Sequence, residues 1–334
     1  MNRIATFIVT AGMVLPLFTA LSDGMRAATA DALPDSRPCV IRLDSAFADA
    51  TVRIDQPAMN PNIETDLLLF ALPNGNTIEW TAGKRMAEGD DWHFDIQHIA
   101  AQTRFLRAAL PDRNIVTAYI MADNKSWPST VSTHAKTDSN YVSAIVDSIV
   151  SMYAEYRPQV ILNGHSGGGR FVLRYIEEQE SIPDQISRIA FLDSDYAYDE
   201  DIHLKKLVDW IDSDTTHALC AIAYNDSTVI FNGKPLVSPR GGTWYRTRWM
   251  QRGLSEYFDF ETKEDTSMIV CKALDGRIQF RLKHNPEGKI YHTVLVERNG
   301  LIHTVLSGTD KEDCGYTFWG DRAYDAFIAD TVWQ

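Results

Sequence analysis

Short apolar runs alternate along the chain with longer segments in which apolar residues recur every three to four positions. The runs predict one or two leading strands over 39–54 and buried strands over 66–72, 114–121, 160–162, 186–192 and 218–224. The periodic segments predict helices over 94–110, 142–156 and 204–211. Strands and helices that alternate in this way form a mostly parallel sheet with helices on both faces, so the pattern predicts an α/β fold.

The pattern changes after residue 226. Segment 231–242 is rich in Gly and Pro and predicts a loop, which a helix over 243–257 follows. A β-meander is then predicted with strands over 268–273, 277–283 and 289–297, and a closing helix over 323–332. We interpret residues 31–334 as a single domain with a helix-plus-meander insertion at about 227–289.

The first 30 residues are expected to be a cleaved signal peptide. Arg3 precedes a mostly apolar stretch over 4–21, and Ala28-Thr29-Ala30 has the small-x-small pattern of a cleavage site. The alternative is a membrane anchor, but Thr10, Gly12 and Pro16 interrupt the apolar stretch. We therefore expect a secreted or periplasmic protein whose mature chain starts near Asp31 and has no stable membrane insertion.

Charge and cysteine content narrow the picture further. The net charge of -13 in 334 residues argues against a nucleic acid or an anionic membrane surface as the main partner. The four cysteines, Cys39, Cys220, Cys271 and Cys314, could form two disulfides in any of three pairings. Cys220 lies inside an apolar run and also fits a buried free thiol.

Residues 164–168, Gly-His-Ser-Gly-Gly, fit the pattern G-x-S-x-G between a predicted strand and a predicted helix. Glycines on both sides of Ser166 allow a tight turn that lifts its hydroxyl clear of the sheet. The N–H of Gly167 then lies where it can bind an oxyanion. The alternative is a glycine-rich turn without chemistry.

This stretch resembles the nucleophile elbow of the α/β-hydrolase superfamily, and the order of predicted elements is similar over most of the mature chain. The resemblance is specific only at this motif. It implies a Ser, an acid and a His in that chain order, each at the carboxyl end of a strand. It also implies a second oxyanion donor after strand 66–72, where Asn74, Gly75 or Asn76 could supply an N–H. We choose Gly75, although an Asn-Gly hairpin turn fits as well.

For the general base we choose His303, which follows the last predicted strand and a turn at Asn299-Gly300. Alternatively, Asn299-Gly300 closes a regular hairpin and His303 lies on its second strand without a catalytic role. The other eight histidines precede the serine, adjoin it, precede the chosen acid or fall within predicted strands: His93, His98, His134, His165, His203, His217, His284 and His292.

For the acid we choose Asp226, which follows the second strand after the serine. Asp193 and Asp195, one strand earlier, are the alternatives, since some relatives place the acid there. Each of these aspartates could instead be a solvated loop residue or a helix cap with no catalytic role.

Aromatic and basic residues suggest where a substrate binds. We assign Trp127, Trp244 and Arg246 to substrate binding. Helix 243–257 is locally basic and interleaves arginines with tryptophans, which suits a polar or anionic ester. The alternative is an exposed helix whose arginines cover aromatic rings.

These observations predict an exported serine hydrolase that acts through Ser166, Asp226 and His303 on a small-molecule or polymer ester. A peptidase or amidase of the same fold is the first alternative, because one triad serves both leaving groups. A secreted binding protein that keeps the fold without turnover is the second. No metal or organic cofactor is implied, since no phosphate loop, dinucleotide fingerprint or zinc-spaced histidine pair occurs in the sequence.

Overall fold

The computed structural model describes residues 39–333. The expected signal peptide over 1–30 and its cleavage site therefore lie outside the described residues. Within 39–333, no helix combines the length and apolar character needed to cross a membrane.

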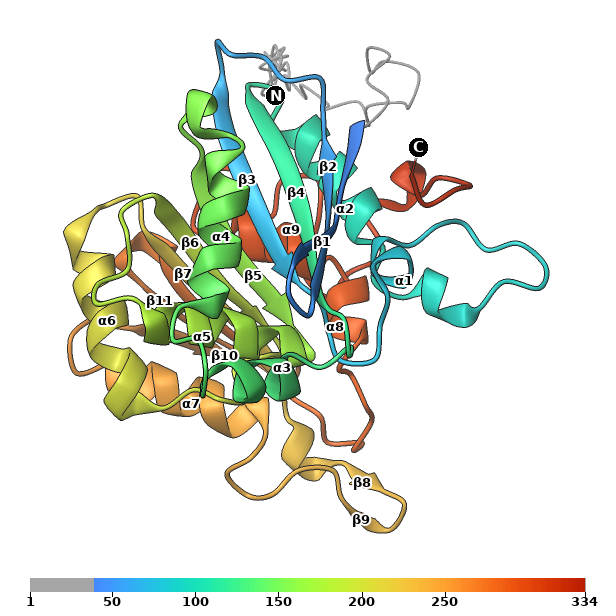
Figure 1. Ribbon diagram of the computed structural model, residues 1–334. Helices are drawn as coiled ribbons and strands as arrows, with labels where there is room; N and C mark the ends of the chain where they lie inside the picture. The colour runs from blue at the N-terminus through green and yellow to red at the C-terminus, as the bar shows by residue number, and fades with distance from the viewer. Residues whose placement is uncertain (1–38, 334) are drawn as a thin grey trace, which may run out of the picture.

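The described residues build one ten-stranded sheet in the order β1-β2-β4-β3-β5-β6-β7-β12-β11-β10 (Figure 1). Neighbours from β4 to β12 pair in parallel, and the two outer strands at each end pair antiparallel. The strands are β1 (Cys39–Phe47), β2 (Ala50–Gln56), β3 (Glu64–Ala71), β4 (Arg113–Ala122), β5 (Gln159–His165), β6 (Ile186–Leu192), β7 (Ala218–Tyr224), β10 (Glu261–Glu264), β11 (Met268–Ala273) and β12 (Ile278–Lys283), with a separate hairpin of β8 (Ile230–Phe231) and β9 (Lys234–Pro235).

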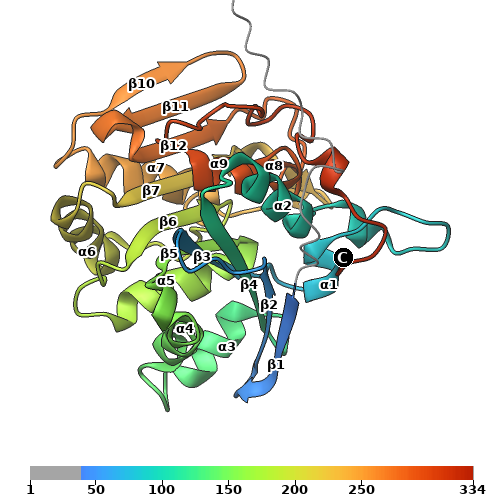
Figure 2. The ribbon, with the colours of Figure 1, turned by 90° about the horizontal axis from the view of Figure 1, so that it is seen from above.

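Helices cover both faces of the sheet (Figures 1 and 2). Consecutive residues of a strand point to opposite faces, so Leu67 and Leu69 of β3 join one core while Leu68 and Phe70 join the other. The first core packs under α3 (Trp127–His134), α4 (Tyr141–Ser151), α5 (Gly169–Glu178), α6 (Glu200–Ser213) and α7 (Thr243–Leu254). The second packs under α1 (Ile78–Ala82), α2 (Ile99–Ala109), α8 (Val294–Glu297) and α9 (Gly300–Leu306). The predicted α/β class is confirmed.

Short 3₁₀ turns complete the secondary structure at the ends of these elements. They are η2 (Trp92–Asp95), η3 (Ala154–Tyr156), η4 (Ser166–Gly168), η5 (Asp226–Thr228), η6 (Leu274–Gly276) and η7 (Asp325–Phe327).

The meander is part of the central sheet and does not form the insertion that the sequence suggested. β12 pairs in parallel with β7 along its whole length, and β11 and β10 extend the sheet from there. The segment after β7 that carries the β8–β9 hairpin protrudes from the body (Figure 1).

Two element predictions are wrong, and both concern short or weakly patterned segments. The expected strand over 289–297 is a loop followed by α8. The closing helix expected over 323–332 is reduced to η7. Short apolar runs do not distinguish a strand from a buried helical turn.

All four cysteines are free within the described part of the chain. Cys220 and Cys271 are buried, as a small apolar side chain would be, whereas Cys39 and Cys314 are exposed.

Candidate active site

The turn around Ser166 has the geometry of a nucleophile elbow. Ser166 directly follows β5 and has a φ of 54°, a left-handed conformation that is uncommon for a residue with a side chain. A Cβ on Gly164 would lie 2.7 Å from the carbonyl carbon of Gly168, and one on Gly168 would lie 2.0 Å from the carbonyl oxygen of Ala71. Only glycine fits these positions, so the chain can pass tightly from β5 into η4 and α5.

Ser166 opens onto a cavity of about 300 Å³ at the carboxyl ends of the parallel strands. Segments that follow β3, β5 and β6 supply most of its walls. The lining residues are Asn74, Pro128, Ser166, Gly167, Arg170, Ser194, Tyr196 and Ala197.

An aspartate and a histidine are hydrogen-bonded at the same end of the sheet. Asp193 is the first residue after β6, and His292 lies in the loop between β12 and α8. The His292 Nδ1–H donates to Asp193 Oδ2 at 2.5 Å. The second carboxylate oxygen of Asp193 accepts the hydroxyl of Thr243, the first residue of α7. The carboxylate is therefore held from two sides.

Ring contacts place His292 beside the serine turn. Its ring centroid is 4.6 Å from that of His165, the residue before Ser166, and 6.4 Å from that of Tyr196, which lines the serine cavity. His165 also donates from Nε2 to the backbone carbonyl of His292 at 3.1 Å. Burial lowers the pKa of His165 well below its ordinary value, so this neighbour stays neutral.

The predicted acid, Asp226, lies next to this pair without binding a histidine among the described residues. Its Oδ2 accepts the backbone N–H of Thr243 at 2.9 Å, so Thr243 bridges Asp193 and Asp226. Burial, with the nearby charge of Asp193, raises the pKa of Asp226 to about 6. Asp195 accepts the hydroxyl of Thr247 at 2.8 Å, and burial raises its pKa to about 8. Of the three candidates, Asp193 is the one that the structure joins to a histidine.

The structure does not bring His303 together with Ser166 or Asp226, so this prediction is wrong. His303 is fully buried in α9, where Nε2–H donates to Gln279 Oε1 at 2.5 Å and Nδ1 accepts the hydroxyl of Tyr316 at 3.1 Å. Burial lowers its pKa well below the ordinary value. Both ring nitrogens are occupied, which leaves none for a serine or an acid.

The sequence does not single out His292, because the stretch 289–297 predicts a strand. The turn-forming segment Asn285-Pro286-Glu287-Gly288, which follows β12, indicates that a loop begins there. Because β12 is the last parallel strand after β7, a histidine in that loop fits the order serine, acid, base.

The two predicted oxyanion donors have different outcomes. Gly167 lines the serine cavity. The N–H of Gly75 donates to the carbonyl oxygen of Lys125 at 2.9 Å, so it is not free to bind an oxyanion and the prediction for Gly75 is wrong. Its neighbour Asn74, which the sequence left open, lines the cavity, and a Cβ added to Gly167 would meet its Oδ1 at 2.0 Å.

None of the three residues assigned to substrate binding lines the serine cavity. Trp127 is buried in the core, where its ring packs edge-on against Phe171 at 4.7 Å. Trp244 lines a separate cavity of about 90 Å³ beside Asp226. Arg246 donates to the carbonyl of Tyr198 at 2.7 Å and fastens α7 to the segment after β6.

Within residues 39–333, no cluster of three or more His, Cys, Asp or Glu side chains is arranged to hold a metal ion. The candidate site consists of a serine at positive φ that lines a small cavity, and of a hydrogen-bonded histidine–aspartate pair beside the serine turn. Together, the parallel strand order and the serine turn after β5 define an α/β-hydrolase fold.

Comparison with known proteins gives distant structural likenesses. The chain is similar to a thermostable esterase, with 14% identity and a TM-score of 0.46 over 81% of this chain, and it spans 63% of that esterase. It is also similar to a predicted CIB-like hydrolase from Thermoplasma acidophilum, with 10% identity, a TM-score of 0.40 and coverage of 81% of this chain and 98% of the other. A third likeness is to poly(aspartic acid) hydrolase-1 from Sphingomonas sp. KT-1, with 13% identity, a TM-score of 0.38 and the same coverages.

No family model matches the sequence, and no curated protein does.

Proposed function

We propose that the protein is an exported serine hydrolase that cleaves carboxylic esters. The observation that carries the proposal is the His292–Asp193 hydrogen bond beside a serine held at positive φ. A serine hydroxyl at its ordinary pKa is a weak nucleophile and needs a neighbouring base that a carboxylate orients. Export rests on the sequence of the first 30 residues alone.

In this mechanism Ser166 Oγ attacks the ester carbonyl while His292 Nε2 removes its proton. Asp193 holds Nδ1–H and stabilises the imidazolium that forms. The negative charge on the carbonyl oxygen is stabilised by the N–H of Gly167 and by a donor of Asn74. His292 then returns the proton to the leaving alkoxide, and an alcohol departs from an acyl-serine.

Water completes the cycle by the same steps in reverse order. His292 takes a proton from the water, whose oxygen attacks the acyl carbon, and Ser166 leaves as a hydroxyl after protonation. The products are a carboxylic acid and the free enzyme. Each residue acts twice, first on the alcohol side and then on the water side.

The test is turnover of p-nitrophenyl esters compared with peptide anilides of matched acyl group. We expect the esters to be hydrolysed faster, and Ser166→Ala to lower kcat by about a million-fold because the triad acts as a unit. Ser194→Ala is the matched control, since Ser194 lines the same cavity; it should change kcat by less than about tenfold. A loss of only about tenfold in Ser166→Ala would place the nucleophile elsewhere.

A further inference from the structure

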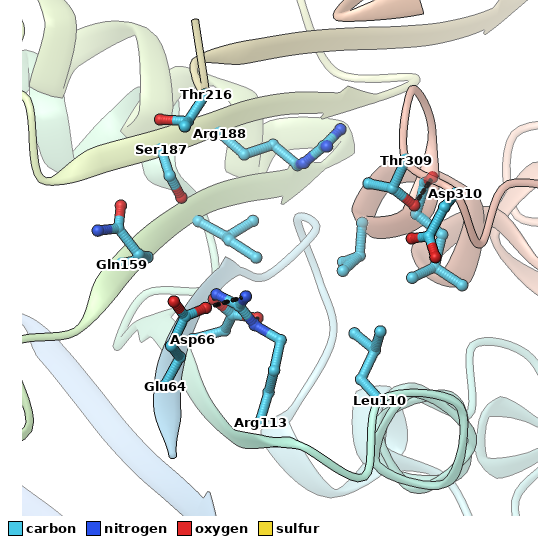
Figure 3. Close-up of a pocket in the computed structure, with 13 residues that line it drawn as sticks. Glu64, Asp66, Leu110, Arg113, Gln159, Ser187, Arg188, Thr216, Thr309 and Asp310 are labelled. Carbon is cyan, nitrogen blue, oxygen red and sulfur yellow. Dashed lines mark hydrogen bonds and ion pairs between the residues drawn. The ribbon is translucent and has the colours of Figure 1, made fainter. Parts of the chain in front are cut away.

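A second cavity lies at the opposite end of β5 from Ser166, and Figure 3 shows the residues that line it. Its volume is about 360 Å³, within the range of about 300–1,000 Å³ that is usual for small-molecule sites. Gln159, the first residue of β5, lines it, whereas Ser166 follows the last residue of that strand. The length of β5 therefore separates the two cavities, and the proposed mechanism makes no use of the second one.

Arg188 of β6 lines this cavity and makes no direct ion pair with a carboxylate among the described residues. The residue is only 8% exposed, and its Nη1 donates to the carbonyl of Thr304 at 3.4 Å and to Ser307 Oγ at 3.1 Å. Among the described residues, no carboxylate lies within ion-pair distance of its guanidinium, and Nε and Nη2 make no hydrogen bond. A buried guanidinium is costly unless an anion accompanies it.

The nearby carboxylates belong to another arginine. Arg113 donates from Nε and Nη2 to both oxygens of Asp66, each at 2.6 Å, and it also pairs with Glu64. Figure 3 shows Asp66 and Arg113 together on the far side of the cavity from Arg188. Arg113 thus makes the direct ion pairs with both acids, whereas Asp66 acts on Arg188 only through space and leaves the guanidinium of Arg188 without a direct ion pair among the described residues.

We propose that this cavity binds a small organic carboxylate, whose two oxygens accept the free N–H groups of Arg188. A planar guanidinium matches a carboxylate with two parallel hydrogen bonds. The other walls include apolar side chains that would cover a short hydrocarbon portion of the ligand: Leu110, Ile161, Val305 and Leu306. An inorganic anion would leave this apolar surface uncovered, so the lining favours an organic acid over phosphate.

The test is isothermal titration calorimetry of the full-length protein with hexanoate and, separately, with inorganic phosphate. We expect saturable hexanoate binding and at least about tenfold weaker phosphate binding, because phosphate gains nothing from the apolar walls. Arg188→Gln should weaken hexanoate binding by at least about tenfold through the loss of charge-assisted hydrogen bonds. Arg188 and Asp310 line this cavity and not the serine cavity, so their variants assign the signal to this site.

A weaker affinity of Arg188→Gln could come from misfolding, so a second variant is chosen in which the proposal predicts tighter binding. Asp310 lies at the rim of the cavity and is exposed, so Asp310→Asn should tighten hexanoate binding by about threefold through the loss of a repelling charge. Asp259→Asn, an equal charge change at an exposed residue outside the cavity, should leave affinity unchanged. The proposal is overturned if hexanoate does not bind, if Arg188→Gln and Asp310→Asn bind it as the native protein does, or if phosphate binds equally well. These results do not depend on ester turnover, so the two proposals can fail separately.

Discussion

Ser166 keeps a backbone conformation that costs about 1–3 kcal/mol for a residue with a side chain. The surroundings enforce it, because backbone atoms of β3 and of the turn itself fill the space where Cβ atoms of Gly164 and Gly168 would lie. The strain has a consequence for chemistry. Ser166 lines the cavity at the start of η4, and in the proposed mechanism the N–H of Gly167 in the same turn stabilises the developing oxyanion.

Asp193 and Asp226 can be distinguished as the acid by matched substitutions. We expect Asp193→Asn to lower kcat by about ten-thousandfold, because an amide no longer fixes the tautomer of His292 or stabilises its cation. Asp226→Asn should lower kcat by less than about tenfold, since Asp226 touches Thr243 and not the imidazole. The measurement is steady-state ester hydrolysis, and the reverse ranking of the two variants would restore Asp226 as the acid.

At the scale of elements, the buried strands were predictable and the site loops were not. β6, β7 and β11 have the bounds that their apolar runs predict, because strands covered on both faces need continuous apolar sequence. The run over 289–297 has a similar composition, yet it forms a loop and α8. Residues 294–297 form a helix because α8 packs against the second core, and this tertiary contact cannot be read from the local sequence pattern.

The candidate site was predictable to the extent that it depends on local sequence. Ser166 and Gly167 lie in a motif whose geometry five adjacent residues determine. The proposed base, His292, and the proposed acid, Asp193, come from the segments after β12 and β6, and their hydrogen bond depends on the strand order. The prediction of Gly75 as an oxyanion donor is wrong for a similar reason, because its N–H donates to the carbonyl of Lys125 from a distant part of the chain.

At the scale of the whole molecule, buried carboxylates gather where α7 crosses the ends of β6 and β7. Thr243 and Thr247 of α7 bind Asp193, Asp195 and Asp226, so one helix organises all three acids. Burial raises the pKa of Asp195 and of Asp226, which favours their protonated forms. The stability of the fold should therefore depend on pH in a way that can be assigned to single residues.

Asp195 provides the clearest case. Burial raises its pKa in the folded protein to about 8, whereas the unfolded chain has its ordinary value. Between these two values the folded state holds a proton that the unfolded state has lost, so stability falls as the pH rises through this window. Asp195→Asn removes this proton linkage, and the loss of unfolding free energy between about pH 5 and pH 9 should shrink by about 2–4 kcal/mol.

Urea unfolding of native protein and Asp195→Asn at a series of pH values measures this difference. Asp259→Asn serves as the control, because Asp259 is exposed and should leave the pH dependence unchanged. An identical pH dependence for native protein and Asp195→Asn would show that Asp195 is ionised in the folded state.

The proposed function depends most on the activation of Ser166 by His292. Labelling by a fluorophosphonate probe, followed by mass mapping of the modified peptide, tests it in native protein, His292→Asn and His303→Asn. We predict rapid labelling at Ser166 in native protein and in folded His303→Asn, and a rate at least about a hundredfold lower in His292→Asn, because the base that activates the hydroxyl is gone. Undiminished labelling in His292→Asn, or its loss in a folded His303→Asn, would contradict the account.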